Sequence, residues 1–113
     1  MSKRKKIKLE TGKFYYMYAG KPHPARIFKI DKKHKTYLSI KTGTTQRKDM
    51  IPIKPIQKGK NSFVHKRPYE GVRSDYGDRE LFGLSFNPSD DTKIKEIEKR
   101  KPKRTKKAKM RYK

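Results

Sequence analysis

Residues 22–45 read PHPARIFKIDKKHKTYLSIKTGTT, and this stretch decides the predicted fold. Two short runs, 25–30 and 36–41, place apolar residues among polar ones, and a charged turn separates them. This pattern predicts two antiparallel strands joined by a hairpin. The Pro-His-Pro loop before the first run offers few amide donors, and a Thr-Gly-Thr-Thr turn ends the second run.

The sequence around this hairpin predicts three or four more short strands. Residues 14–18 (FYYMY) and 62–65 have strand chemistry, and 51–56 (IPIKPI) has two prolines that restrict it to an edge or a bulge. Residues 81–86 (LFGLSF) form the last predicted strand, and 66–80 are predicted to be a long surface loop. The expected fold is therefore mainly β, a small SH3-like antiparallel barrel, because closure removes exposed sheet edges.

The chain divides into four predicted regions. They are a disordered basic arm over 1–10, the β-barrel over 11–88, a short helix over 89–101 and a disordered basic tail over 102–113. Acids at 90–91 suit the positive end of a helix dipole, and Pro102 is expected to end the helix.

The charge is concentrated at the two ends of the chain. The net charge is +23, of which residues 1–8 carry +5, residues 93–113 carry +10 and the centre carries +8. Clustered Lys and Arg neutralise phosphates and release counterions. This distribution predicts contact with nucleic acid, either RNA or DNA, or with the ribosome, and the alternative is a solvated, solubilising tail.

Other classes of protein are excluded by what the sequence lacks. There is no cysteine, which excludes a disulfide framework and thiolate chemistry. The three histidines have no metal-ligand spacing, so we expect no metal and no cofactor. Either His23 or His65 would suit proton transfer near pH 7. No apolar run is long enough to span a membrane or form a secretory signal, so we expect a cytoplasmic protein with no membrane partner.

Arg26 and the threonine cluster at 42–45 pose one question about the site. If the two strands pair, the start of one lies beside the end of the other at one rim of the barrel. A fixed cation beside hydroxyls and a glycine could hold a phosphate. The same residues suit a barrel corner with Arg26 as a surface charge, and the residues alone leave both interpretations open.

Nucleic-acid contacts are predicted at cationic, hydroxyl and aromatic side chains of this rim, the charged loop and the tail. These residues are His23, Thr44, Thr45, Arg47, Lys66, Arg67, Tyr69, Arg73, Lys103, Arg104, Lys106 and Lys107. The cations would contact phosphates, and the tyrosine would stack on a base. The acids of 66–80 are expected to form salt bridges within the loop.

Three segments resemble the PemK/MazF-like toxins, small barrels that cut RNA in bacterial toxin–antitoxin systems. They are 12–16 (GKFYY), 24–30 (PARIFKI) and 39–44 (SIKTGT), so the resemblance covers mainly residues 12–45. The sequence departs from the family pattern in having Ala25 in place of the proline beside the arginine, with Pro24 one place earlier.

This resemblance implies a metal-independent endoribonuclease with Arg26 and Thr42 as its catalytic pair. The arginine would act as acid and stabilise the scissile phosphate, the hydroxyl would help to hold it, and the 2′-hydroxyl of the RNA would be the nucleophile. A homodimer and an acidic antitoxin partner are also implied. Two other functions remain open: a non-catalytic nucleic-acid- or ribosome-binding accessory protein of a mobile element or phage, and an inhibitor of a nucleic-acid-binding protein.

Overall fold

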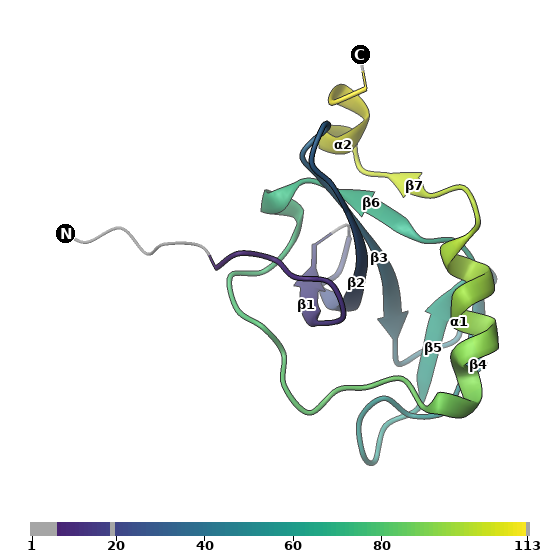
Figure 1. Cartoon of the computed structure of the whole chain (residues 1–113). Helices are drawn as coiled ribbons and strands as arrows, with labels where there is room; N and C mark the ends of the chain where they lie inside the picture. Colours follow the sequence, from purple (N-terminus) through teal and green to yellow (C-terminus); the bar gives the residue numbers. More distant parts are fainter. Residues whose placement is uncertain (1–6, 19, 113) are drawn as a thin grey trace.

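The computed structural model describes residues 7–18 and 20–112 of the chain. In this part of the chain, seven strands form one bent sheet, and one α-helix precedes the last strand while another follows it (Figure 1). The elements are β1 (Phe14–Met17), β2 (His23–Asp31), β3 (Thr36–Gly43), β4 (Met50–Ile53), β5 (Ser62–His65), β6 (Tyr69–Gly71), α1 (Asp91–Glu98), β7 (Lys103–Arg104) and α2 (Lys106–Met110). The prediction of a small, mainly antiparallel β fold with a short C-terminal helix is confirmed.

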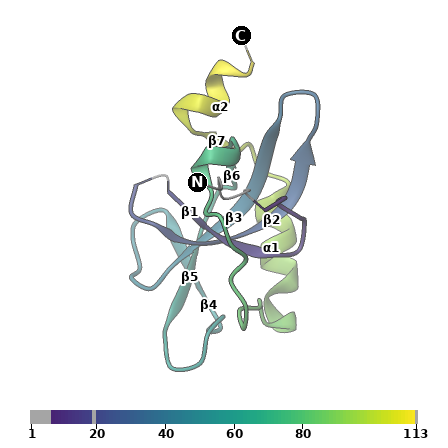
Figure 2. The ribbon, with the colours of Figure 1, turned by 90° about the vertical axis from the view of Figure 1, so that its left-hand side faces the viewer.

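Strand β3 is the centre of the sheet. The main path runs β1-β2-β3-β5-β4, and β6 also pairs with β3. The first half of β3 pairs with β6, whereas its last two residues, Thr42 and Gly43, pair with β5. The hairpin of β2 and β3 and the loop between β4 and β5 project at opposite ends of the molecule (Figure 2). The two ends of β3 therefore lie in different surroundings.

A β-bulge in β2 changes the faces that its side chains occupy. Ile27 lies opposite Ser39, but the pairing then shifts so that Lys29 lies opposite Leu38. An extra residue reverses the alternation of side chains after it. Phe28 consequently packs on one core cluster and Ile30 on the other, although regular alternation would place both on one face.

Two apolar clusters hold the fold together. One brings Phe14, Ile40 and Phe86 against α1, which buries Ile94 and Ile97 on one face, at a spacing of three residues. The start of α1 is fixed by the buried Asp90 carboxylate, whose Oδ2 accepts a hydrogen bond from the amide of Lys54 at 2.9 Å. The second cluster contains Leu9, Tyr15, Met17, Ala25, Ile27 and Tyr76.

Two predicted segments differ from the structure. Residues 81–86 are irregular apart from one bridge at Leu81, and Phe82 is 81% exposed. Gly83 has φ +78°, which interrupts an extended strand. Residues 66–80 contain β6 and bury Glu70 and Tyr76, so the prediction of a surface loop is wrong there.

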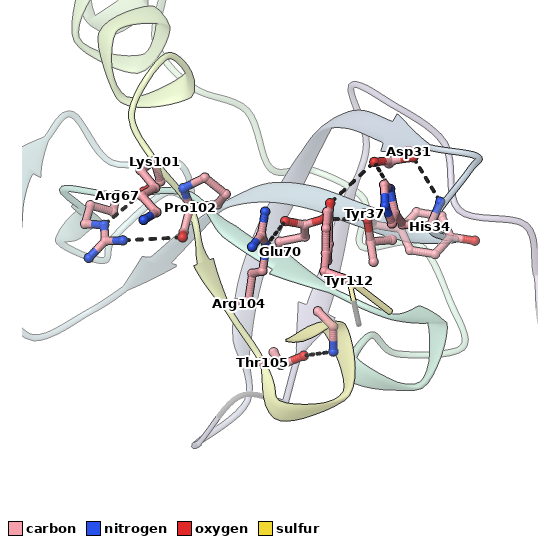
Figure 3. Close-up of polar contacts among 12 residues, drawn as sticks. Asp31, His34, Tyr37, Arg67, Glu70, Lys101, Pro102, Arg104, Thr105 and Tyr112 are labelled. Atoms are coloured by element: carbon pink, nitrogen blue, oxygen red, sulfur yellow. Dashed lines mark hydrogen bonds and ion pairs between the residues drawn. The ribbon is translucent and has the colours of Figure 1, made fainter. Parts of the chain in front are cut away.

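The C-terminal tail is ordered over 103–112, and the prediction of a disordered 102–113 is wrong for these residues. Strand β7 pairs in parallel with β6, and Thr105 caps α2 by accepting a hydrogen bond from the amide of Ala108. The buried Glu70 accepts a hydrogen bond from Thr36 at 2.5 Å. It also accepts hydrogen bonds from Arg104 at 2.9 Å and from the Tyr112 hydroxyl (Figure 3). A buried carboxylate with several donors thus anchors the basic tail.

The N-terminal segment is also bound in part. Leu9 is 1% exposed in the second cluster, and the carbonyl of Ile7 accepts two hydrogen bonds from Arg73 at 2.9 and 3.2 Å. The predicted disorder of residues 1–10 is therefore wrong at 7–9, and residues 1–6 lie outside the described part.

Candidate active site

A cavity of about 510 Å³ opens at the C-terminal end of β3. Its lining comes from segments far apart in the sequence, namely the residues that enter β2, the turn after β3, and the end of β5 with the start of β6. The lining groups that bear chemistry are Lys21, His23, Lys41, Thr42, Thr44, Thr45, Arg47, His65 and Tyr69. No carboxylate belongs to the lining formed by the described residues.

Two histidines share this cavity. His23 is the first residue of β2 and half-buried, and His65 is the last residue of β5, with a side chain 13% exposed. Burial is the main cause that lowers the pKa of each, and the charge of Lys41 lowers both further. Asp49 opposes this shift at His65 without cancelling it. Both imidazoles are therefore neutral at pH 7 and able to accept a proton.

Asp49 helps to set the position of His65. Its Oδ2 lies 3.6 Å from His65 Nδ1, which is beyond hydrogen-bond distance and leaves this buried nitrogen without a hydrogen bond to any described residue, and 3.4 Å from Lys103 Nζ. The His65 ring also meets Tyr69 edge to face, with ring centres 5.1 Å apart. The imidazole is thus held between a carboxylate and an aromatic ring.

The cations give the cavity a positive potential. Lys41 is only 4% exposed, and its ammonium lies 5.3 Å from the centre of the Tyr69 ring. Burial, followed by the charge of Arg47, lowers the pKa of Lys41. Arg47 and Lys21 are exposed at the same cavity. Because no lining carboxylate offsets these charges, the cavity attracts phosphate groups.

The threonines have two different roles in the geometry. Thr42 is buried, and its Oγ1 donates a hydrogen bond of 2.7 Å to the carbonyl of Pro24. This bond ties the end of β3 to the start of β2 and so fixes the backbone beside His23. Thr44 and Thr45 are exposed in the following turn, where their hydroxyls can donate to a phosphate oxygen.

Arg26 is not among the residues that line the cavity, although its strand pairs with β3 as predicted. Its Nη2 lies 3.6 Å from Glu98 Oε2 on α1, and its Cζ lies 4.5 Å from the centre of the Phe86 ring. Its Nε is buried without a hydrogen bond to any described residue. The structure therefore brings His23, and not Arg26, together with the threonine cluster.

The other predicted contact residues divide into three groups. The cavity collects Thr42, His23, Thr44, Thr45, Arg47 and Tyr69. Around Asp49 and β7 lie Lys66, Arg67 and Lys103, where the Arg67 guanidinium donates to the carbonyls of Lys101 and Pro102 (Figure 3). The third group lies away from the cavity and consists of Arg73, Arg104, Lys106 and Lys107. In this group Arg104 donates a hydrogen bond to Glu70, and Lys107 donates one to Ser74. Six of the fourteen predicted site residues therefore line one cavity, and the other eight lie outside its lining.

Lys41 was missing from the predicted site, and His65 was predicted as a possible proton acceptor without a place beside the threonine cluster. In the sequence, Lys41 resembles any polar residue of a strand. Its position in the cavity becomes apparent only because the end of β3 is buried in the structure. His65 is 42 residues from His23, and the pairing of β5 with Thr42 and Gly43 brings it to the cavity. The composition of the 41–47 turn was the available signal, since it joins cations and hydroxyls.

Within residues 7–18 and 20–112, no group of three His, Asp or Glu side chains lies close enough together to hold a metal ion. No helix in the same part has the length and apolar character needed to cross a bilayer.

Comparison with known proteins identifies the fold. No protein-family model and no curated protein matches this chain. Among solved structures, the chain is similar to an endoribonuclease in complex with its cognate antitoxin from mycobacterial species. The TM-score is 0.53 with 14% sequence identity, and the match covers 80% of this chain and 90% of that chain. The chain therefore has a fold similar to that of this endoribonuclease.

Proposed function

We propose that this chain binds single-stranded RNA in the cavity at the end of β3 and cleaves it by attack of the RNA's own 2′-hydroxyl. One observation carries the proposal: two part-buried, neutral histidines share a cavity with cations and hydroxyls and with no lining carboxylate among the described residues. The likeness of fold to an endoribonuclease supports the same class of activity.

The side chains of the cavity can supply each step of this reaction. A neutral histidine, His23 or His65, accepts the proton of the 2′-hydroxyl while that oxygen attacks the neighbouring phosphorus. The bond from phosphorus to the 5′-oxygen breaks, and this oxygen takes a proton from the other histidine, when protonated, or from water. The products are a 2′,3′-cyclic phosphate and a 5′-hydroxyl. Lys41 and Arg47 stabilise the negative charge that develops on the phosphate oxygens.

The roles of Arg26 and Thr42 differ in this proposal from those that the family resemblance implies. We assign proton transfer to the histidines, because Arg26 is engaged with Glu98 and Phe86. Thr42 acts as a positioning residue through its bond to Pro24. Catalysis by Arg26 remains a prediction of the resemblance alone.

An acidic protein is proposed as a second partner. The net charge of +23 favours polyanions in general, and the similar endoribonuclease is in complex with its cognate antitoxin. A homodimer also stays a prediction.

Arg47 and its neighbour Lys48 provide a matched test of the cavity. Arg47→Ala is expected to lower kcat/KM for a single-stranded RNA by about 100-fold, because it removes a charge that stabilises the transition state. Lys48→Ala removes the same charge one residue away and outside the lining, and is expected to change kcat/KM by about threefold at most. Equal losses in the two variants would indicate general electrostatic binding, and intact RNA with the wild-type chain would leave a non-catalytic binder.

The pH dependence of cleavage follows from the lowered pKa values of the histidines. The base must be neutral, and each folded-state pKa lies below the ordinary 6.5. The rate is therefore expected to fall as the pH drops through a midpoint below 6.5. The measurement is single-turnover cleavage from pH 5 to 8 at constant ionic strength. A midpoint above 7 would contradict a buried, cation-flanked histidine as the base.

A further inference from the structure

We propose that a second cavity, at the hairpin end of β3, binds an acidic peptide segment whose apolar side chain rests on Ile30 and Tyr37, above the buried Leu9. This cavity has a volume of about 380 Å³, which is within the usual range for ligand pockets. Its apolar floor is surrounded by Lys8, Lys32, Lys35 and Arg111. An apolar floor with a cationic rim matches a peptide that carries an apolar side chain among carboxylates.

The floor is held in place by contacts from several parts of the chain. Leu9 is buried there because Arg73 binds the carbonyl of Ile7 on one side and those of Tyr76 and Gly77, at 3.2 and 3.1 Å, on the other. The bulge at Phe28 turns Ile30 toward this side of the sheet. The cavity is therefore preformed, which reduces the entropy that a ligand must lose to order it.

The rim has cations whose charge no lining carboxylate fully offsets. Asp31 is the one acid among the described residues that line this cavity. It accepts hydrogen bonds from the amide and Nδ1 of His34 at 3.0 and 2.8 Å and from Tyr112 at 3.4 Å (Figure 3). Lys32, Lys35 and Arg111 are exposed, so their charges are available to an incoming carboxylate.

Lys35 has a backbone conformation that its side chain does not favour. Its φ is +56°, in the left-handed region, and it is the one non-glycine residue with positive φ in the described chain. Glycine or asparagine suits such a turn position better. The lysine at this position puts a cation at the cavity and lowers the stability of the turn. Residues in such strained conformations are often found at binding sites.

The chemistry of the floor favours a peptide over RNA. Leu9 and Ile30 are aliphatic, and the Tyr37 ring meets Tyr76 edge to face with centres 6.0 Å apart. Stacking of successive bases uses several aromatic rings, and Tyr37 is the one aromatic side chain among the described residues of this lining. β3 has eight residues and spans roughly 25 Å, with the two cavities at its opposite ends. The peptide site is therefore separate from the histidine cavity and does not rest on RNA cleavage.

The test uses two synthetic probes and charge reversals in one turn. The full chain is titrated with a labelled heptapeptide of six glutamates and a central leucine, and with the same peptide carrying a central glycine. Fluorescence anisotropy near physiological salt is expected to show about tenfold tighter binding of the leucine peptide. Lys35→Glu is expected to weaken that binding about tenfold, and Lys33→Glu, which alters the same turn outside the lining, about twofold at most.

A third variant separates binding from folding. Lys35→Gly relieves the left-handed backbone, so Tm is expected to rise by a few degrees while the leucine peptide binds severalfold more weakly. The proposal is overturned if the two peptides bind equally, if Lys33→Glu weakens binding as much as Lys35→Glu, or if the wild-type chain does not bind the leucine peptide. It is also overturned if an oligouridine of equal charge, and not the peptide, shifts the amide resonances of Ile30 and Tyr37.

Discussion

Replacing Glu70 by alanine is expected to lower the free energy of unfolding by about 3 kcal/mol. Glu70 is 1% exposed and accepts hydrogen bonds from Thr36, Arg104 and Tyr112, three groups that would lose their partner. The estimate is at the lower limit for breaking a buried pair, because the side chain of Arg104 is partly exposed and water can solvate it. Urea unfolding followed by circular dichroism measures this change.

The tail provides a second readout for this variant. Without Glu70, β7 and α2 lose their main anchor, so limited trypsin digestion is expected to cleave within 103–111 much faster. Glu96→Ala is the matched control, because Glu96 is exposed on α1, and its effect on stability should stay within about 0.5 kcal/mol. Equal stability of Glu70→Ala and wild type would contradict the anchoring role of this carboxylate.

Glu70 is expected to make the free energy of unfolding decrease as the pH falls. Burial alone would raise the pKa of Glu70, but hydrogen bonds from Thr36, Tyr112 and Arg104 outweigh burial and hold the pKa below its ordinary value. A carboxyl with a lowered folded-state pKa stabilises the fold above its unfolded-state pKa, and this contribution is lost as the pH falls through the folded-state value.

His23→Ala is expected to lower kcat/KM for RNA cleavage by about 100- to 10,000-fold, because the cavity would lose a proton-transfer group. His65→Ala is expected to have an effect of the same order, and the double variant to be no slower than the worse single one, since the two act in one reaction. The measurement is initial-rate cleavage of a single-stranded RNA with the full chain.

His34→Ala is the control for these variants. His34 lies at the other end of β3, bound to Asp31 and stacked on Tyr112, and it is not part of the histidine cavity. Its removal should leave cleavage within about threefold of wild type, because a remote histidine neither transfers a proton nor contacts the phosphate. Equal losses in His34→Ala and His23→Ala would show that the variants act through stability.

The central hairpin was predictable because its signals are local. Alternating apolar residues and a charged turn predicted strands at 25–30 and 36–41, which lie within β2 and β3, and the acids at 90–91 predicted the start of α1. The predicted loop at His23 and Pro24 is wrong, because both residues pair with β1. The bulge at Phe28 was not predictable, since an inserted residue depends on the partner strand. The end of the chain was misjudged because its composition is that of a solvated tail, whereas its order depends on Glu70, 34 residues before Arg104.

The candidate site was predicted in part for the same reason. His23 begins β2 and residues 42–45 lie at the end of β3, so the pairing of the two strands alone brings them close together. The direction of the Arg26 side chain depends on α1, more than sixty residues away, which supplies Glu98. His65 and Lys41 become part of a site only through the pairing of β3 with β5.

The most direct test of RNA cleavage in the histidine cavity is to identify the ends of the RNA fragments. A long single-stranded RNA is incubated with the wild-type chain in EDTA, and the fragments are analysed by mass spectrometry. Attack by the 2′-hydroxyl predicts 2′,3′-cyclic phosphate and 5′-hydroxyl ends, which should be absent with His23→Ala. Intact RNA, or fragments that form equally with His23→Ala, would contradict the account.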